Sequence, residues 1–447
     1  MILGGGFGGF YAARELERLL PAQSARVTLV NETNFMLYTP LLPGVVGAAL
    51  DPRHVVVPLR QQLPRTEVVI GSVTGADPAD RQVDVTRIDE QQVSIQYDHL
   101  IVALGSISRT FPIPGLAEHA IGLKSLADAT ALRNRVLECL DIAEASDDER
   151  SRAEHLGFVF VGAGYAGVEG LAELQDFAAG AIENYPRSRL QGMNWVLVEA
   201  AERVMKEMPG SLSRFAEEEL RGRGIEIRTS SQLARVSDSS VELASGEIIP
   251  TRTVVWTAGV RPSPAIAKLP LSTDPAGRIT VDRDLRAADP ARHFDGRIWA
   301  IGDCAAVPDP SHEGHVCPPT AQHAIRQGRL VAKNIAAALV GRPTAPFTYK
   351  TKGVVAELGR SRAVAITLGV GWRGFPAWLI TRTYHLMLMP GVGRRLRLLI
   401  DWNVALLFGR DSASPGRLGR PVPLQEPPTS HAADSAAGAE ERELPAD

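Results

Sequence analysis

The 447-residue chain has little of three features that define other classes of protein. Its three cysteines, Cys139, Cys304 and Cys317, are far apart, so neither a C-x-x-C or zinc site nor a disulfide framework is predicted. Its formal net charge is only −3, so a nucleic-acid partner is not indicated. No run of 18 or more apolar residues occurs, so no transmembrane helix is predicted. Sparse cysteine fits a reducing cytoplasm.

What the chain does have is a glycine-rich turn at its start. Gly4, Gly6 and Gly9 fit G-x-G-x-x-G between a short apolar run and a helix. In this pattern the first glycine permits a tight turn, the second lets a pyrophosphate approach, and the third allows close packing. The strand at 26–30 is followed by Glu32, an acid placed to bind a ribose diol. The turn predicts a dinucleotide site.

The same pattern returns near the middle of the chain. An apolar strand at 158–161 leads into Gly162, Gly164 and Gly167, and the strand at 195–198 ends at Glu199. Two such fingerprints in one chain predict two dinucleotides held against each other.

Glu199 indicates which nicotinamide cofactor the second site prefers. A carboxylate there accepts both ribose hydroxyls and repels a 2′-phosphate, so NADH is favoured over NADPH. Arg203 and Lys206 are close enough in sequence to weaken this preference.

The chain starts almost directly in the first strand. Only Met1–Leu3 precede Gly4, whereas strands usually run five or six residues. We therefore expect no signal peptide, and we expect that the natural start lies a few residues upstream.

Further strands end in small residues, which leaves room for a bulky cofactor across the strand end. These are the segments at 98–106, 253–262 and 297–305. The segment at 33–43, where flavin enzymes that reduce disulfides carry a cysteine pair, contains no cysteine. Thiol chemistry is therefore not expected.

Two apolar stretches rich in arginine and aromatic residues, 375–389 and 394–408, read as short amphipathic helices. They are too short and too charged to span a bilayer, so we predict that they lie on a membrane surface. Ordinary core or dimer-interface helices are the alternative. Residues 411–447, rich in Pro, Ala, Ser and Glu, are predicted to be disordered.

With these residues in view, the chain from Met1 to about Arg410 resembles the type II NADH:quinone oxidoreductases, flavoproteins with two dinucleotide-binding domains. The resemblance rests on GGGFGG at 4–9, YDHLIVALGS at 97–106, GAGYAGVE at 162–169, TAGVRPSP at 257–264, AIGDCA at 300–305 and PPTAQHAIRQG at 318–328. A C-terminal pair of helices ending in LLFGRD completes it.

The resemblance implies a set of site residues. FAD would be held by Gly4, Gly6, Phe7, Gly8, Gly9, Glu32, Thr33, Val73, Asp303 and Ala324. NADH would be held by Gly162, Gly164, Gly167, Glu199 and Gly259. Glu169 matches a glutamate that handles protons near the nicotinamide, and Gln322 matches a glutamine facing the quinone. No metal site is implied. Gly170 departs from the family pattern, in which we expect Leu-Ala after Val-Glu.

The predicted fold is α/β, with two Rossmann-like domains and a C-terminal membrane-docking segment. The FAD domain comprises 1–115 and 286–345, interrupted by an NADH domain at 116–285. The docking region follows at 346–410, and the tail occupies 411–447.

The predicted activity is hydride transfer from NADH to FAD, then two-electron transfer to menaquinone or ubiquinone without proton pumping. The enzyme would lie on the cytoplasmic face of the cell membrane, as a monomer or a homodimer. One alternative is a soluble FAD-dependent reductase serving ferredoxin or another small acceptor. Sulfide:quinone reductase, a near relative, would need a cysteine pair. An alternative of another class is a nucleotide-dependent redox-sensing protein.

Overall fold

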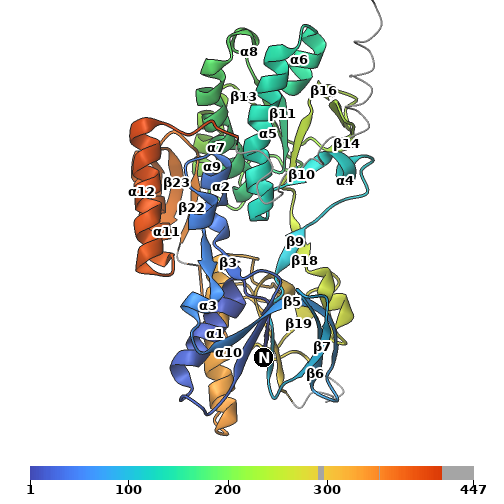
Figure 1. Ribbon diagram of the computed structural model, residues 1–447, viewed down its shortest axis with the longest axis vertical. Helices are drawn as coiled ribbons and strands as arrows, with labels where there is room; N and C mark the ends of the chain where they lie inside the picture. Colours follow the sequence, from blue (N-terminus) through green and yellow to red (C-terminus); the bar gives the residue numbers. More distant parts are fainter. Residues whose placement is uncertain (290–295, 352, 415–447) are drawn as a thin grey trace, which may run out of the picture. The chain divides into compact units, whose positions relative to one another are not determined.

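The computed structural model describes residues 1–289, 296–351 and 353–414 (Figure 1). All the elements below belong to the compact unit formed by residues 1–412. Apart from residues 411–414, the predicted tail lies outside the described residues.

The first sheet contains seven strands, and the first fingerprint lies at its centre. Their order is β20 (Ile298–Ala300), β8 (Leu100–Val102), β1 (Ile2–Leu3), β2 (Val27–Asn31), β5 (Thr66–Asp77), β6 (Gln82–Arg87) and β7 (Gln92–Gln96). The first five are parallel, and β5, β6 and β7 pair antiparallel. The expected hairpin is therefore present.

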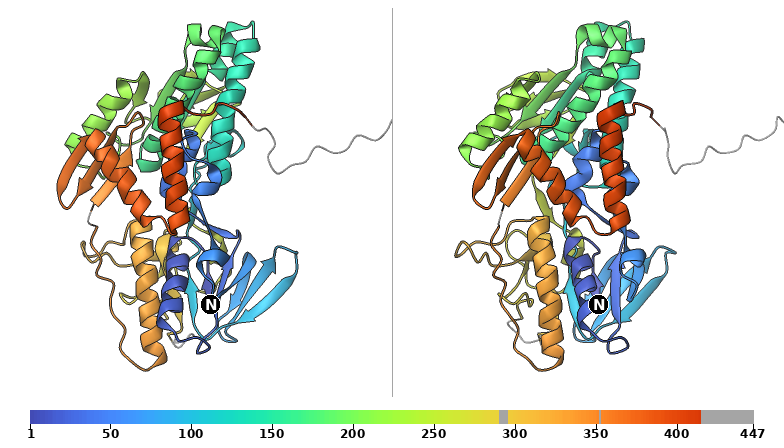
Figure 2. Two further views of the ribbon diagram at one scale, coloured as in Figure 1. Left: turned by 60° about the vertical axis from the view of Figure 1, so that its left-hand side comes forward. Right: turned by 90° about the vertical axis from the view of Figure 1, so that its left-hand side faces the viewer.

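Two helices from opposite ends of the first domain pair here: one packs on this sheet, and the other packs on the first helix. They are α1 (Phe7–Leu19) and α10 (Ala321–Leu339), which run side by side (Figure 2). Their close approach depends on Gly328, where a Cβ atom would stand 2.3 Å from the Gly8 carbonyl oxygen. Packing against α1 therefore seats the N-terminus of α10 beside the glycine-rich turn.

The second sheet repeats this plan with five parallel strands around the second fingerprint. Their order is β10 (Ala120–Gly122), β17 (Thr253–Trp256), β11 (Gly157–Val161), β12 (Asn194–Val198) and β13 (Ile225–Arg228). Strand β11 is buried throughout, as expected for a parallel strand covered on both faces. The surrounding helices are α4 (Leu116–His119), α5 (Leu126–Ala145), α6 (Glu149–His155), α7 (Tyr165–Ala181), α8 (Pro186–Gln191) and α9 (Gly210–Arg221).

A short ribbon joins the two halves. Strands β9 (Ser106–Ser108) and β18 (Val260–Pro262) pair antiparallel between the two sheets (Figure 1). Smaller pieces complete the fold: α2 (Leu42–Val46), α3 (Leu59–Gln62), β3 (Phe35–Leu37) with β4 (Val56–Pro58), β14 (Leu233–Val236) with β15 (Ser240–Leu243) and β16 (Ile248–Pro250), and β19 (Ile279–Thr280) with β21 (Ala305–Ala306). The predicted α/β fold with two Rossmann-like halves is confirmed.

The C-terminal region adds a small sheet that the sequence did not indicate. Strands β22 (Gly353–Glu357), β23 (Ala363–Thr367) and β24 (Val370–Gly374) form an antiparallel meander. The expected helices follow as α11 (Phe375–Leu388) and α12 (Val392–Phe408) (Figure 2). Among the described residues, no helix is long and apolar enough to cross a membrane.

Helix α12 has one buried side and one broad exposed apolar side. Leu398 and Trp402 are buried and pack in the main core. The Arg382 guanidinium lies 4.9 Å from the centroid of the Trp402 ring, a cation–π contact. The exposed apolar side chains are Val392, Leu396, Leu399, Ile400, Val404, Leu406, Leu407 and Phe408.

Candidate functional site

The first glycine-rich turn has the geometry of a phosphate cradle. Gly4 has a φ of +98°, and a Cβ there would stand 2.3 Å from the Ala103 carbonyl oxygen. At Gly9 a Cβ would stand 1.8 Å from the Gly4 carbonyl oxygen. At Gly6, by contrast, a Cβ would meet nothing within 4 Å. The first and third glycines are therefore needed for packing, and the second opens onto a space at the N-terminus of α1.

The second turn repeats this geometry closely. Gly162 has a φ of +102°, and a Cβ at Gly167 would stand 1.9 Å from the Gly162 carbonyl oxygen. Gly164 again faces open space. Gly259, with a φ of +95°, follows β17, the strand beside β11. The turn thus leaves the N-terminus of α7 open to a second anionic group.

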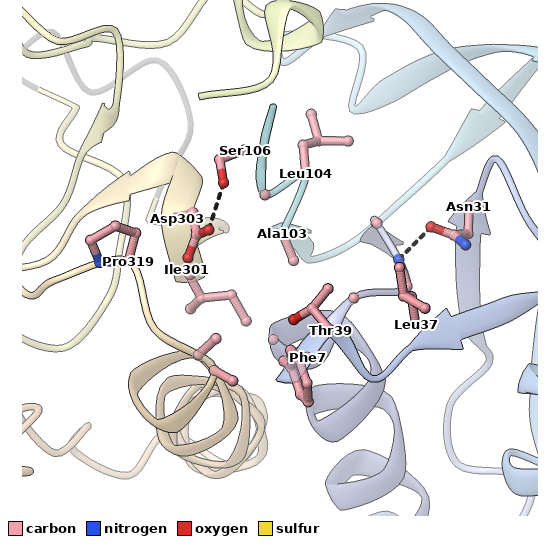
Figure 3. A pocket seen from close by; sticks show the side chains of 18 of the residues that line it. Phe7, Asn31, Leu37, Thr39, Ala103, Leu104, Ser106, Ile301, Asp303 and Pro319 are labelled. Carbon is pink, nitrogen blue, oxygen red and sulfur yellow. Dashed lines mark hydrogen bonds between the residues drawn. The ribbon is translucent and has the colours of Figure 1, made fainter. Parts of the chain in front are cut away.

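A cavity of about 320 Å³ opens at the first turn (Figure 3). Of the predicted FAD residues, Gly4, Gly6, Phe7, Gly8, Thr33, Asp303 and Ala324 line it. Val73 does not line the cavity and is buried in β5, so its role stays a prediction. Further walls come from Leu37, Thr39, Ala103, Leu104, Ser106, Lys124, Ile301 and Pro319.

The residue at the end of β2 that faces the turn is Asn31. Its Oδ1 accepts a hydrogen bond from the Gly5 N–H at 2.7 Å (Figure 3). In the second half, Glu199 Oε2 accepts from the Ala163 N–H at 2.5 Å, so Asn31 is the counterpart of Glu199. Glu32 is exposed and does not line the cavity, because successive side chains alternate sides at a strand end. Its assignment as a ribose ligand stays a prediction.

Asp303 belongs to a small polar cluster on the opposite wall. Ser106 donates a hydrogen bond to Asp303 Oδ2 at 2.6 Å (Figure 3), and Lys124 Nζ donates to Ser106 Oγ at 3.1 Å. Lys124 precedes α5 of the second half, so this cluster ties the two halves together at the cavity. No sequence motif indicated Lys124.

Glu199 is held by two backbone amides. Besides the Ala163 contact, its Oε1 accepts from the Ala201 N–H at 2.8 Å. The carboxylate is therefore fixed at the end of β12, beside the turn at 162–167. Its assignment as a ribose ligand stays a prediction.

Glu169 lies in the first turns of α7, partly buried. Burial raises the pKa of the Glu169 carboxyl to about 8, and the nearby Glu357 and Glu173 carboxyls add to the rise. The Glu357 N–H donates to Glu169 Oε1 at 2.9 Å, which opposes the rise. A carboxyl with this pKa is mostly protonated near neutral pH, and its role in proton transfer stays a prediction.

Gln322 lies at the N-terminus of α10, and both ends of its amide are occupied. Its Nε2 donates to the Gly353 carbonyl at 3.0 Å, and the Tyr349 hydroxyl donates to its Oε1 at 2.7 Å. Sequence reasoning found Gln322 but not Tyr349 or strand β22, because only the tertiary fold brings them together.

The residues of the cavity fit a flavin dinucleotide. The cradle at Gly6 accepts a pyrophosphate on the N-terminus of α1. Asp303 stands where it can bind polyol hydroxyls, and the apolar walls at Leu37, Ile301 and Pro319 suit a flat ring system.

Comparisons with known proteins agree with this geometry. A family model described as pyridine nucleotide-disulphide oxidoreductase matches residues 1–328. A probable NADH dehydrogenase of Dictyostelium discoideum is 29% identical over 424 residues, 93% of this chain and 90% of that one. A type II NADH:quinone oxidoreductase of Mycobacterium tuberculosis is 32% identical over 428 residues, 92% of this chain and 88% of that one.

A solved structure supports the fold. The structure of NDH2 from Plasmodium falciparum in complex with NADH superimposes with a TM-score of 0.83 at 20% identity, covering 92% of this chain and 99% of that one. The chain belongs to the pyridine nucleotide-disulphide oxidoreductase family, and within it to the type II NADH:quinone oxidoreductases.

Proposed function

We propose that this protein is a non-proton-pumping NADH:quinone oxidoreductase that uses FAD as its cofactor and oxidises NADH. The observation that carries the proposal is the pair of matched glycine cradles, one opening onto the flavin cavity and one beside Glu199. Related proteins whose names include NADH and quinone support it.

The chain contributes binding and proton handling to this reaction. FAD, when bound, supplies hydride acceptance and two-electron transfer. Gly6 and Gly164 let the two pyrophosphates approach, and Glu199 orients the NADH ribose. The Glu169 carboxyl holds a proton that it donates to the acceptor, and it is then reprotonated from water. Gln322, whose amide is fixed by Tyr349 and Gly353, would face the acceptor.

The free cysteines argue against a thiol step. Cys139, Cys304 and Cys317 are buried, and burial raises the pKa of the Cys304 thiol to about 11 and that of Cys317 to about 12. Such thiols stay protonated and unreactive at neutral pH. A dithiol mechanism of the disulfide-reducing or sulfide-oxidising kind is therefore not supported.

The proposal is tested by rapid mixing of the yellow purified protein with NADH. We expect fast bleaching of the flavin absorbance, then fast recovery on mixing with a menaquinone or ubiquinone analogue. Slow recovery with every quinone but fast recovery with ferredoxin would identify a soluble reductase. A protein that NADH does not bleach at all would point to the sensor alternative.

We further propose that α11 and α12 dock on the cytoplasmic face of the cell membrane, where the quinone is dissolved. The exposed apolar side chains of α12 are accompanied by Arg394, Arg395 and Arg397, a combination typical of interfacial helices. The competing use of this surface is a homodimer interface.

Replacing Leu396, Ile400 and Leu407 together by serine is expected to release the protein from vesicles of anionic phospholipid. Each side chain contributes about 1.5 kcal/mol or more when buried, so the loss of three should lower the affinity by about 1,000-fold or more. Cosedimentation measures the loss. The matched control replaces Ile88, Leu190 and Ile248, exposed apolar residues outside the two helices, by serine.

The control should bind vesicles like the original protein. Unchanged vesicle binding by the α12 variant would contradict membrane docking. A change from dimer to monomer with no change in vesicle binding would assign the surface to a homodimer instead.

A further inference from the structure

The edge strand β22 contacts both residues predicted to act on the acceptor. At one end, the Gly353 carbonyl accepts the hydrogen bond from Gln322 Nε2. At the other end, the Glu357 N–H donates to Glu169 Oε1. One short strand thus joins the N-terminal regions of α10 and α7, and the same strand edge faces both side chains.

The pairing of β22 with β23 determines which backbone groups face this edge. Within the described residues β23 is its single strand neighbour. Beyond the strand end, the Leu358 N–H donates to the Arg362 carbonyl at 2.8 Å, which makes that pair a hydrogen-bonded one. Bonded and non-bonded pairs alternate in an antiparallel ladder. Gly353, Val355 and Glu357 therefore direct their N–H and C=O groups away from β23, as the two side-chain contacts require.

Val355 lies midway between the two contacts. Residues two apart in a strand are separated by about 6.8 Å, so Gly353 and Glu357 lie about 13 Å apart along the edge. Among the described residues, none bonds the outward N–H or C=O of Val355. The residue is partly buried, and its outward N–H needs a partner, either a ligand or water. The gap thus offers one donor between the two predicted acceptor-site residues.

We propose that the Val355 N–H donates a hydrogen bond to a carbonyl oxygen of the bound quinone, so that the edge of β22 forms one wall of the acceptor site. This inference rests on the proposed function. A quinone ring offers carbonyl oxygens that accept hydrogen bonds and has no donor of its own. Negative charge grows on these oxygens as electrons arrive, and a fixed backbone N–H stabilises such charge without having to reorient.

Val355→Pro tests the proposal because it removes this N–H alone. Proline is tolerated at an edge position whose N–H is outside the ladder. Loss of one hydrogen bond to developing charge is expected to slow flavin reoxidation by the quinone analogue about tenfold or more. Flavin bleaching by NADH and the melting temperature should stay at the original values.

Two control variants separate the N–H from packing. Val355→Ala keeps the N–H and shortens the side chain, so its effect on reoxidation measures packing alone and should be much smaller than that of Val355→Pro. Ala356→Pro removes an N–H that bonds β23, so it should lower the melting temperature. If Val355→Pro fails to fold, replacing Val355 by its α-hydroxy acid analogue removes the same N–H and keeps the side chain.

The outcomes distinguish this inference from the function on which it rests. Original protein that quinone does not reoxidise would overturn the proposed function. Original protein that quinone reoxidises quickly, with the folded proline or ester variant equally fast, would overturn the role of Val355 and leave the proposed function intact.

Discussion

Gly164→Val is expected to give a yellow protein that NADH no longer bleaches, whereas Gly6→Val is expected to give a colourless one. Both glycines have ordinary negative φ angles, −70° and −71°, and a Cβ at either meets nothing within 4 Å. Neither substitution strains the backbone or displaces a protein atom. The added side chains fill only the space through which a pyrophosphate would approach.

The size of each effect follows from close packing. A side chain inserted into a close contact costs about 1–3 kcal/mol, a factor of about 10 to 100 in affinity. The ratio of flavin to protein absorbance measures FAD retention, and rapid mixing measures bleaching. Because the two cradles belong to separate halves, each variant should lose one nucleotide and keep the other site intact.

Gly167→Ala provides the contrasting control. A Cβ there would stand 1.9 Å from the Gly162 carbonyl oxygen, so this variant should lose thermal stability as well as NADH binding. Gly6 and Gly164 variants that melt at the original temperature would confirm that the effect is on the ligand. A Gly164→Val protein that NADH bleaches at the original rate would remove the second cradle from the nucleotide site.

Most of the fold could be predicted from the sequence because local signals and global architecture agree. Each fingerprint combines a strand, a turn that only glycine permits, and a helix, so Gly4 and Gly162 predict the centres of the two sheets. Local signals also fix the start of α5 (Leu126–Ala145), where Ser125 and Asp128 form a capping box.

The site residues were harder to predict from the sequence than the fold. A choice between adjacent residues, or a contact between distant segments, determines which side chains form the site. Asn31 and Glu32 are adjacent, and only the end of β2 shows which faces the turn. Lys124, Tyr349 and β22 carry no motif, because their roles arise from contacts between distant segments.

Trp402 is a similar case on the C-terminal helices. The amphipathic pattern correctly predicts an exposed apolar side on α12, but it does not show which large residue turns inward. Trp402 packs in the core, where the Arg382 guanidinium lies 4.9 Å from the centroid of its ring and 4.2 Å from that of Trp378. A cation so placed is invisible in the periodicity of α12.

Glu169→Gln is expected to lower kcat with quinone by about 100-fold, the usual contribution of a general acid. The amide has the same size as the carboxyl and can still accept the bond from the Glu357 N–H, so the fold around α7 should persist. What is lost is the transferable proton. Flavin bleaching by NADH should change much less, because hydride transfer does not consume that proton.

The pH profile distinguishes this role from simple structural support. Because burial raises the pKa of Glu169 to about 8, the carboxyl is protonated below that pH and can donate. Above about pH 8 it ionises, so the original protein should lose quinone activity on the alkaline side. Glu169→Gln should show a low activity without that alkaline fall. Steady-state kcat measured between about pH 6 and pH 10 provides the test.

Three neighbouring charged side chains influence the titration of Glu169, so their effects on the pH profile must be distinguished from its own. Glu173 and Glu357 raise its pKa, and Arg382, 3.8 Å from Glu357 Oε1, acts chiefly on Glu357. Burial raises the pKa of Glu357 as well, so this residue is the competing source of an alkaline fall. Because the Glu357 charge raises the pKa of Glu169, Glu357→Gln should retain the alkaline fall but shift it to a lower pH. If it loses the fall and Glu169→Gln keeps it, the proton belongs to Glu357.

Stability gives a readout that is independent of turnover. A carboxyl whose pKa is raised from 4.5 to about 8 by folding binds its proton more tightly in the folded chain. The free energy of unfolding of the original protein should therefore fall as pH rises from about 4.5 to 8, and level off above that. Glu169→Gln has no such group, so it should lose less stability over that range. Parallel curves for the two proteins would mean that the Glu169 carboxyl is not proton-bound at neutral pH, and its assignment as the acid would fail.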